Sequence, residues 1–195
     1  MISIRRFPIA LLVFGLPVFA AAVPGINNFD KINEQVYRGA QPSNEGFRYL
    51  AQIGVKNIID LREADGRSRE EQKMVTAAGM TYINVPMTGL TPPTDAEINR
   101  ILAILEDVTS GPVFVHCKRG ADRTGAVIGA YHIQHDKWDN KQALKDAMNH
   151  GMSHFQFFRQ SYIRNFKPRA IEAAAKPATT DAVTALPAVA IPAKN

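Results

Sequence analysis

The chain contains one cysteine among its 195 residues, and this scarcity restricts what the thiol can do. A single cysteine cannot form a disulfide within the chain, which excludes a small fold held together by disulfides and a redox pair of cysteines. Cys117 is therefore either an inert buried thiol or a reactive one.

Dense charge of one sign is also absent. Lysine and arginine total 23, and aspartate and glutamate total 18, which gives a formal net charge of +5. A mildly basic surface helps to attract an anionic substrate, but it falls short of the basic patch that binds nucleic acid. We therefore expect no nucleic-acid partner.

The longest apolar run lies at the start of the chain. Arg5 and Arg6 precede the run FPIALLVFGLPVF, and small residues follow it. This pattern predicts a signal peptide over residues 1–22, cut after Ala22 or, as an alternative, after Ala20. Loss of the two arginines lowers the net charge from +5 to +3. The predicted location is periplasmic or secreted, with no membrane span after cleavage, and an uncleaved anchor is the competing interpretation.

The other end of the chain is biased in composition. Residues 171–195 are rich in alanine, proline and threonine and have neither helix nor strand periodicity, so we expect a disordered tail there. This leaves one predicted domain over residues 23–170, which is long enough to bury a workable core. Nothing in the sequence predicts its oligomeric state.

Within that domain, apolar segments of strand length alternate with segments of helical periodicity. Ser43 carries a helix N-cap signal, and Thr94 and Glu97 have capping-box spacing. The alternation predicts an α/β fold: a small, mostly parallel central sheet of about four strands flanked by helices. The predicted strands span 36–39, 55–62, 80–87 and 112–117, and the predicted helices span 43–54, 68–79, 124–135, 140–150 and 153–165, with another that begins at 94.

The cysteine stands where such a sheet binds ligands. His116 and Cys117 end the last predicted strand, and ligands bind outside the carboxyl ends of the strands. The loop that follows opens a helix near Thr124, so backbone N–H groups and the positive helix end converge on one point. Gly120 lets the loop curve inward, and Arg123 can grip two phosphate oxygens. The same field lowers the pKa of the Cys117 thiol and favours a nucleophile below a bound phosphate.

These residues resemble a known signature. HCKRGADRTG is similar to the signature of the cysteine-dependent protein tyrosine and dual-specificity phosphatase superfamily: His-Cys, five residues, Arg, Ser or Thr, and Gly. VYRGAQPS and GVKNIIDLR look like the opening strands of its compact atypical dual-specificity branch. The resemblance covers residues 33–166 and implies a protein tyrosine phosphatase-like fold.

The resemblance also implies a chemistry. It is hydrolysis of phosphate monoesters through a phosphocysteine intermediate on Cys117, with phosphate held by Arg123 and with no metal or other cofactor. The implied partner is a phosphorylated substrate, either a phosphoprotein or an inositol phosphate or phosphoinositide. The substrate-binding positions implied by the signature are Lys118, Arg119, Gly120, Ala121 and Thr124.

The sequence leaves the proton donor open. Members of the superfamily usually carry an aspartate on a loop well before the cysteine, but that region reads NVPMTGLTPPTD here, with no aspartate near Thr88 and Gly89. Asp95 follows the Thr94 cap, where a carboxylate complements the helix dipole without any catalytic task. Asp122 is the other candidate, either as the acid or as an acceptor that orders the loop. The predicted catalytic set is Cys117, Arg123 and Asp122.

Three further interpretations follow from local pattern. Arg62 either adds to the field at the mouth of the site or pairs with Glu63. His116 is expected to orient the loop through backbone hydrogen bonds rather than to act as a base. The aromatic residues of HFQFFRQSYIRNF recur at helical spacing, which predicts that they lie in the core.

Two other functions fit parts of the pattern. A non-catalytic phosphate-binding module would keep the loop and lack the proton donor. Thiol redox chemistry of the arsenate-reductase kind needs a resolving cysteine that this chain lacks, and rhodaneses normally have a shorter loop between cysteine and arginine.

Overall fold

The computed structural model describes residues 23–169. The predicted signal peptide over 1–22 and the predicted tail over 171–195 lie outside the described residues, so both stay predictions. Within the described part of the chain, no helix is both long and apolar enough to cross a membrane. The strands are β1 (Asp30–Lys31), β2 (Val36–Ala40), β3 (Asn57–Asp60), β4 (Thr81–Asn84) and β5 (Val113–Cys117). The helices are α1 (Asn44–Gln52), α2 (Gly66–Ala77), α3 (Asp95–Glu106), α4 (Asp122–Gln134), α5 (Asn140–Asn149) and α6 (Phe157–Asn165), with a 3₁₀ turn, η1 (Val108–Ser110), between α3 and β5.

The strands form one sheet in the order β1-β2-β5-β3-β4. Four of them, β2, β5, β3 and β4, are parallel neighbours, which confirms the predicted α/β class. The two-residue strand β1 pairs antiparallel with β2 and brings the number of strands to five rather than about four. Such a short edge strand carries no alternating pattern that a sequence reading can detect.

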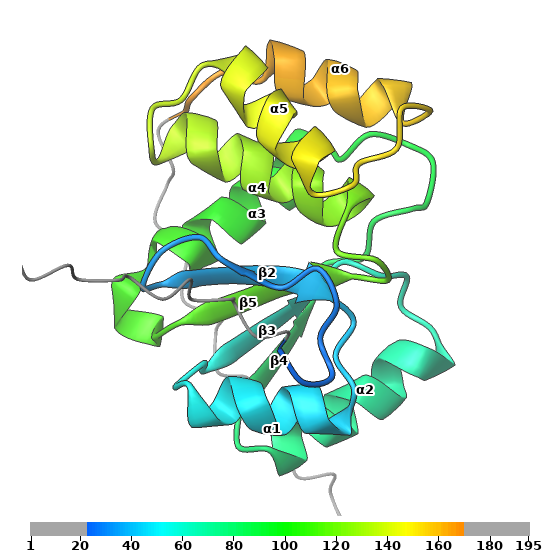
Figure 1. Ribbon diagram of the computed structural model, residues 1–195, viewed down its shortest axis with the longest axis vertical. Helices are drawn as coiled ribbons and strands as arrows, with labels where there is room; N and C mark the ends of the chain where they lie inside the picture. Colours follow the sequence, from blue (N-terminus) through cyan, green and yellow to red (C-terminus); the bar gives the residue numbers. More distant parts are fainter. Residues whose placement is uncertain (1–22, 170–195) are drawn as a thin grey trace, which may run out of the picture.

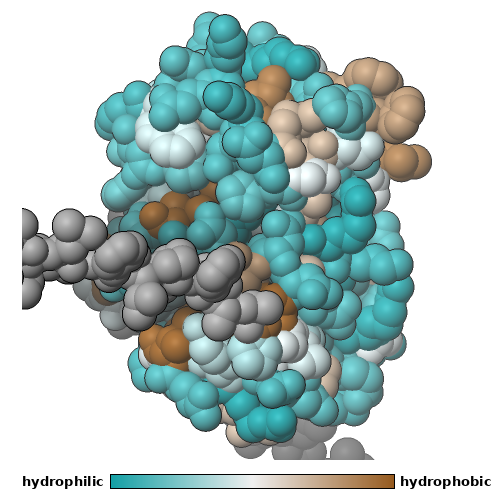
Figure 2. All heavy atoms as spheres, viewed as in Figure 1, coloured by the Kyte–Doolittle hydropathy of each residue, from teal (hydrophilic) through white to brown (hydrophobic). Residues whose placement is uncertain are grey.

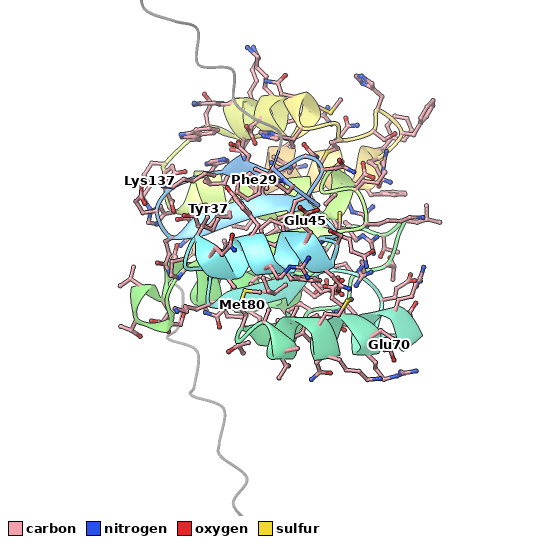
Figure 3. All side chains as sticks on the ribbon, turned by 60° about the horizontal axis from the view of Figure 1, so that its bottom comes forward. Phe29, Tyr37, Glu45, Glu70, Met80 and Lys137 are labelled. Carbon is pink, nitrogen blue, oxygen red and sulfur yellow. The ribbon has the colours of Figure 1, made fainter. Side chains whose placement is uncertain are left out.

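Helices cover both faces of the sheet (Figure 1). One core lies between the sheet and helices α3 to α6, and a second lies between the sheet and helices α1 and α2. Figure 3 brings the α1–α2 face forward; the labelled Tyr37 and Met80 belong to its core, whereas Glu70 lies on the exposed side of α2. Since β5 lies inside the sheet between β2 and β3, all five of its residues are buried.

Local signals set most of the helix starts. The Ser43 side chain caps α1, and Thr94 and Glu97 form the predicted capping box of α3. Asp65 caps α2 and forms a capping box with Ser68, so the helix begins at Gly66 rather than at 68. Helix α4 differs from these, because its N-cap is Ala121 and no side chain caps it. Its first backbone N–H groups are therefore not satisfied by a side-chain cap and can serve a ligand.

Candidate active site

Cys117 ends β5 at the carboxyl edge of the sheet, and a tight loop joins it to α4. We call residues 117–123 the Cys117 loop. Gly120 in this loop has a φ of +69°, and a Cβ on it would lie 2.3 Å from the backbone carbonyl carbon of Gly39. Only glycine combines this φ with so close a backbone approach. The loop can therefore fold against the end of β2.

Two side chains hold the outer side of the Cys117 loop. The guanidinium of Arg38, fully buried, donates from Nη2 to the carbonyl of Gly120 at 2.9 Å. Asn28 Nδ2 donates to the same carbonyl at 3.1 Å and to that of Arg119 at 3.3 Å. A trans peptide directs its carbonyl and the next N–H to opposite sides, so the N–H groups of Gly120 and Ala121 face away from these donors. This arrangement turns backbone donors toward the inside of the loop, where an anion can accept them.

Cys117 is 3% exposed, and its sulfur lies in a field that favours the thiolate. Burial by itself raises the pKa of the thiol, but the nearby side chain and N–H of Thr124, the N–H of Arg119 and the charge of Arg123 outweigh it. The net result is a pKa below the ordinary value. A lowered pKa favours the thiolate, which is the reactive form of cysteine.

Arg123 lies at the edge where β3, β4 and β5 end. Its Nη1 donates to the carbonyl of Met87 at 3.1 Å and to that of Leu61 at 3.4 Å. These two carbonyls follow β4 and β3, so the sheet itself positions the guanidinium. Beside it is a small pocket, lined by Gln41, Arg62, Glu63, Arg67, Lys118 and Arg123.

A buried charge network lies beneath the loop. The His116 Nε2 is 2.8 Å from a carboxylate oxygen of Glu71, and Arg62 donates to both Glu71 at 2.6 Å and Asp60 at 2.8 Å. Burial by itself lowers the pKa of His116. The nearby carboxylates of Glu71 and Asp60 raise that pKa by more than burial lowers it, so the net shift is upward. The other ring nitrogen, Nδ1, is 3.4 Å from the carbonyl oxygen of Cys117, as expected for a residue that orients the loop.

The expected pairing of Arg62 with Glu63 needs correction. Arg62 pairs with Asp60 and Glu71 rather than with Glu63, because the side chain turns into the interior where α2 supplies Glu71. Asp60, Glu71 and His116 bring potential ligand atoms within 4.8 Å of one another. Arg62 already supplies the positive charge that two buried carboxylates require.

Asp122 accepts hydrogen bonds on both carboxylate oxygens. Oδ1 accepts from the backbone N–H of Ser153 at 2.8 Å, and Oδ2 accepts from the exposed side chain of Arg119. These contacts tie the start of α4 to the segment that precedes α6. Of the two roles left open for Asp122, the geometry favours the acceptor that orders the loop.

Asp95 is held away from catalysis by other partners. Its carboxylate accepts from the hydroxyl of Tyr162 at 3.0 Å and from Arg169 at 2.7 Å. The hydrogen bond from Arg169 holds the pKa of Asp95 below its usual range, which disfavours the protonated form that an acid needs. The structure supports the helix-start role for this residue.

Sequence reasoning missed Arg159, which organises the loop between β4 and α3. We call residues 85–94 the β4–α3 loop. Arg159 is fully buried and donates from Nη2 to the carbonyl of Thr88 at 2.6 Å and from Nη1 to that of Gly89 at 2.9 Å. The contact spans about 70 positions, with sequence separations of 71 and 70. No local pattern reports a contact of that range.

The aromatic residues before and within α6 correct another expectation. Phe155, Phe157 and Phe158 are 84%, 65% and 67% exposed, so the prediction that they lie in the core is wrong. Helix α6 begins at Phe157 rather than at 153, and its buried face carries Arg159, Gln160 and Ile163. The prediction holds for Phe166, which is buried.

Comparison with known proteins identifies relatives of this chain. A family model described as "PTP-NADK: DSP-PTPase phosphatase fused to NAD+ Kinase" matches residues 20–165. "Dual specificity protein phosphatase TpbA" of Pseudomonas aeruginosa is 32% identical over 136 residues, which are 69% of this chain and 59% of that protein. "Inositol diphosphatase DSP5" of Arabidopsis thaliana is 29% identical over 106 residues, 52% of each chain. The chain thus spans between half and three fifths of the length of these two relatives.

The fold agrees with that relationship. The crystal structure of P. aeruginosa TpbA superposes with a TM-score of 0.64 at 25% identity, and the alignment covers 75% of this chain and 89% of that one. The family match includes β5, the Cys117 loop and α4. The chain belongs to the atypical dual-specificity branch of the cysteine-dependent protein tyrosine phosphatase superfamily.

Proposed function

We propose that this chain is an exported, metal-independent phosphatase that uses Cys117 as its nucleophile. The observation that carries the proposal is the buried thiol of lowered pKa at the centre of a loop whose backbone donors and Arg123 can hold a phosphate. Export rests on the predicted signal peptide over residues 1–22 and places the enzyme in the periplasm or outside the cell.

In the first step, the Cys117 thiolate attacks phosphorus. A sulfur–phosphorus bond forms, and the bond from phosphorus to the leaving oxygen breaks. The inward N–H groups of the loop and the guanidinium of Arg123 stabilise charge on the equatorial phosphate oxygens. The leaving oxygen departs with the electron pair of the broken bond and takes a proton where its basicity requires one.

In the second step, water attacks the phosphocysteine. An oxygen–phosphorus bond forms, the sulfur–phosphorus bond breaks, and phosphate leaves with the protons of the water. The side chain of Thr124 is fully buried beside the sulfur and stabilises the thiolate as it departs. The product phosphate then exchanges with solvent and regenerates the free site.

The missing proton donor bears on the substrate class. The β4–α3 loop carries no acid before Asp95, and Asp122 and Asp95 are both engaged elsewhere. Without an acid, hydrolysis is fastest when the leaving group is stable as an anion, as in an aryl phosphate or a phosphoanhydride. We therefore propose substrates with such leaving groups, including compounds that carry a diphosphate. The name of the relative "Inositol diphosphatase DSP5" fits this class.

Charge at the mouth supports a substrate with more than one phosphate. Lys118 and Arg123 form no ion pair with a carboxylate in the described part of the chain, although other arginines nearby do. Arg123 holds the phosphate that lies in the loop, and Lys118, which has no acidic partner in the described residues, can hold a second one.

A non-catalytic phosphate-binding module on the same fold is the second candidate, and the absent acid is the observation that favours it. Turnover separates the two. The full chain should hydrolyse para-nitrophenyl phosphate in the presence of a metal chelator. The hydrolysis rate of Cys117→Ser should be at least about a thousandfold lower. The variant should still bind tungstate, measured by calorimetry, because its loop is unchanged. Tungstate binding without turnover in the wild-type chain would identify a binding module.

A further inference from the structure

Large apolar side chains gather at one place on the surface of the described residues. Leu90 is 80% exposed, and Phe155, Phe157 and Phe158 are 65–84% exposed. Figure 2 shows hydrophobic side chains that project beyond the outline of the molecule near the segment that precedes α6. We call these four residues the apolar rim.

The rim is fixed beside the Cys117 loop. Ser153, two residues before Phe155, donates its N–H to Asp122 at the start of α4. On the other side, Arg159 binds the carbonyl of Gly89, next to Leu90, and Arg123 binds that of Met87. The rim residues therefore lie on two segments that are joined to the Cys117 loop, directly or through Arg159, by hydrogen bonds.

We propose that the apolar rim inserts into the surface of a lipid bilayer and presents the Cys117 loop to a phosphorylated lipid headgroup. The side chains are largely exposed, and Phe155 lies edge to face against Phe157. Protruding phenylalanine and leucine beside basic residues are typical of interfacial membrane binding. Lys118, exposed and without an acidic partner in the described residues, supplies charge complementary to anionic headgroups.

A second copy of the chain fits the rim less well. Three phenylalanines and one leucine, partly exposed, offer about 500 Å² of apolar surface, on the basis of about 150–250 Å² for a whole aromatic side chain. A stable interface needs about 800 Å² from each partner. A bilayer imposes no such minimum, because each inserted side chain leaves water independently.

If the apolar rim inserts into a bilayer, a lipid can be the substrate, and this inference rests on the proposed function. A lipid whose chains stay in the bilayer can place its terminal phosphate above Cys117 while the rim lies among the headgroups. The enzyme then acts at the membrane surface without extracting its substrate.

Insertion is tested directly with Phe155→Trp in the full chain and vesicles of phosphatidylcholine and phosphatidylglycerol. Subtraction of the wild-type spectrum removes the signal of Trp138, the one native tryptophan. We expect the emission of the new tryptophan to shift to the blue and to be quenched by lipids brominated on their chains. Residues 1–22 are common to both proteins, so the difference reports on the rim alone. An unchanged emission would overturn the proposal.

The second experiment measures hydrolysis of two prenyl diphosphates that share the same headgroup. One has a long prenyl chain and is embedded in vesicles, and the other has a short chain and is soluble in water. Phe155→Ser combined with Phe158→Ser should lower hydrolysis of the vesicle substrate at least about tenfold and leave the soluble substrate unchanged. Val108→Ser is the matched control, because Val108 is 73% exposed but lies in η1, before β5. Equal losses on both substrates, or dimerisation that depends on the phenylalanines, would contradict the proposal. Failure of both hydrolyses with insertion intact would instead contradict the proposed function.

Discussion

The Cys117 loop and the β4–α3 loop leave the same edge of the sheet, but the fold holds them differently. Gly120 and Ala121 of the first loop are buried, and its carbonyls accept from Arg38 and Asn28. Thr88, Gly89 and Leu90 of the second loop are exposed, and the buried side chain that binds it comes from α6. The first loop is held by Arg38 of the neighbouring strand β2 and by Asn28, whereas the second is held by Arg159 of α6 and by Arg123 of the first loop.

The difference separates two tasks. A loop that binds phosphate through backbone donors must keep those donors in place, since stabilisation by fixed dipoles is lost when they reorganise. A loop that does not supply such donors can vary more in sequence, and here it has no aspartate near Thr88 and Gly89, where members of the superfamily usually carry one. The predictions below test this contrast from the largest expected effect to the smallest.

Replacement of one glycine in each loop gives the sharpest contrast. Gly120→Ala should lower turnover of para-nitrophenyl phosphate at least about a hundredfold. Residue 120 has a positive φ, and the new Cβ would lie 2.3 Å from the backbone of Gly39. Gly89→Ala is the matched control, since a Cβ there meets nothing within 4 Å. Steady-state rates check both variants. Similar losses in the two variants would show that the loops are equally constrained.

Glu71→Gln tests the charge network beneath the Cys117 loop. Because Glu71 raises the pKa of His116, the stability of this pair is fully present below the ordinary histidine pKa of about 6.5 and is lost as pH rises through the raised value. We expect the variant to lose about 3 kcal/mol of unfolding free energy near pH 6 and less at higher pH. Urea unfolding across this range measures the effect. Glu70→Gln, exposed on the same helix, is the control, and a pH-independent loss in Glu71→Gln would argue against a protonated His116.

Asp122→Asn distinguishes loop ordering from acid catalysis. The amide can still accept from Ser153 but loses its charge pairing with Arg119, so we expect rates to fall by about tenfold or less. The loss should be the same for an aryl phosphate and an alkyl phosphate, because positioning does not depend on the leaving group. A loss confined to the alkyl ester would instead identify Asp122 as the general acid.

Asp95→Asn, at the first residue of α3 directly after the β4–α3 loop, should have the smallest effect. Removal of the charge should lower the unfolding free energy by less than about 1 kcal/mol, because the carboxylate is exposed and pairs with Arg169 at the surface. The pKa of Asp95 is depressed, so this contribution is present at neutral pH and disappears as pH falls through the folded value. Thermal unfolding at two pH values measures it. The ratio of aryl to alkyl hydrolysis should not change, and a changed ratio would restore Asp95 as the acid.

Local chemistry explains what could be predicted. The capping box at Thr94 and the strand–loop–helix around Cys117 depend on residues a few positions apart, and the structure contains both. The short strand β1 could not be predicted, because two residues carry no periodic pattern and pair with β2 only once the sheet exists.

The sequence by itself determined the α/β class, the position of Cys117 at the carboxyl edge of the sheet and the loop that turns backbone donors toward an anion. These features follow from short-range rules of helix start, strand burial and glycine conformation. Tertiary structure alone decided that Arg62 pairs with Glu71, that Asp122 binds Ser153 and that three phenylalanines of a helical pattern remain exposed. Each of these depends on which distant segment packs against the residue, and the free energy of burial is set by that partner rather than by the order of residues along the chain.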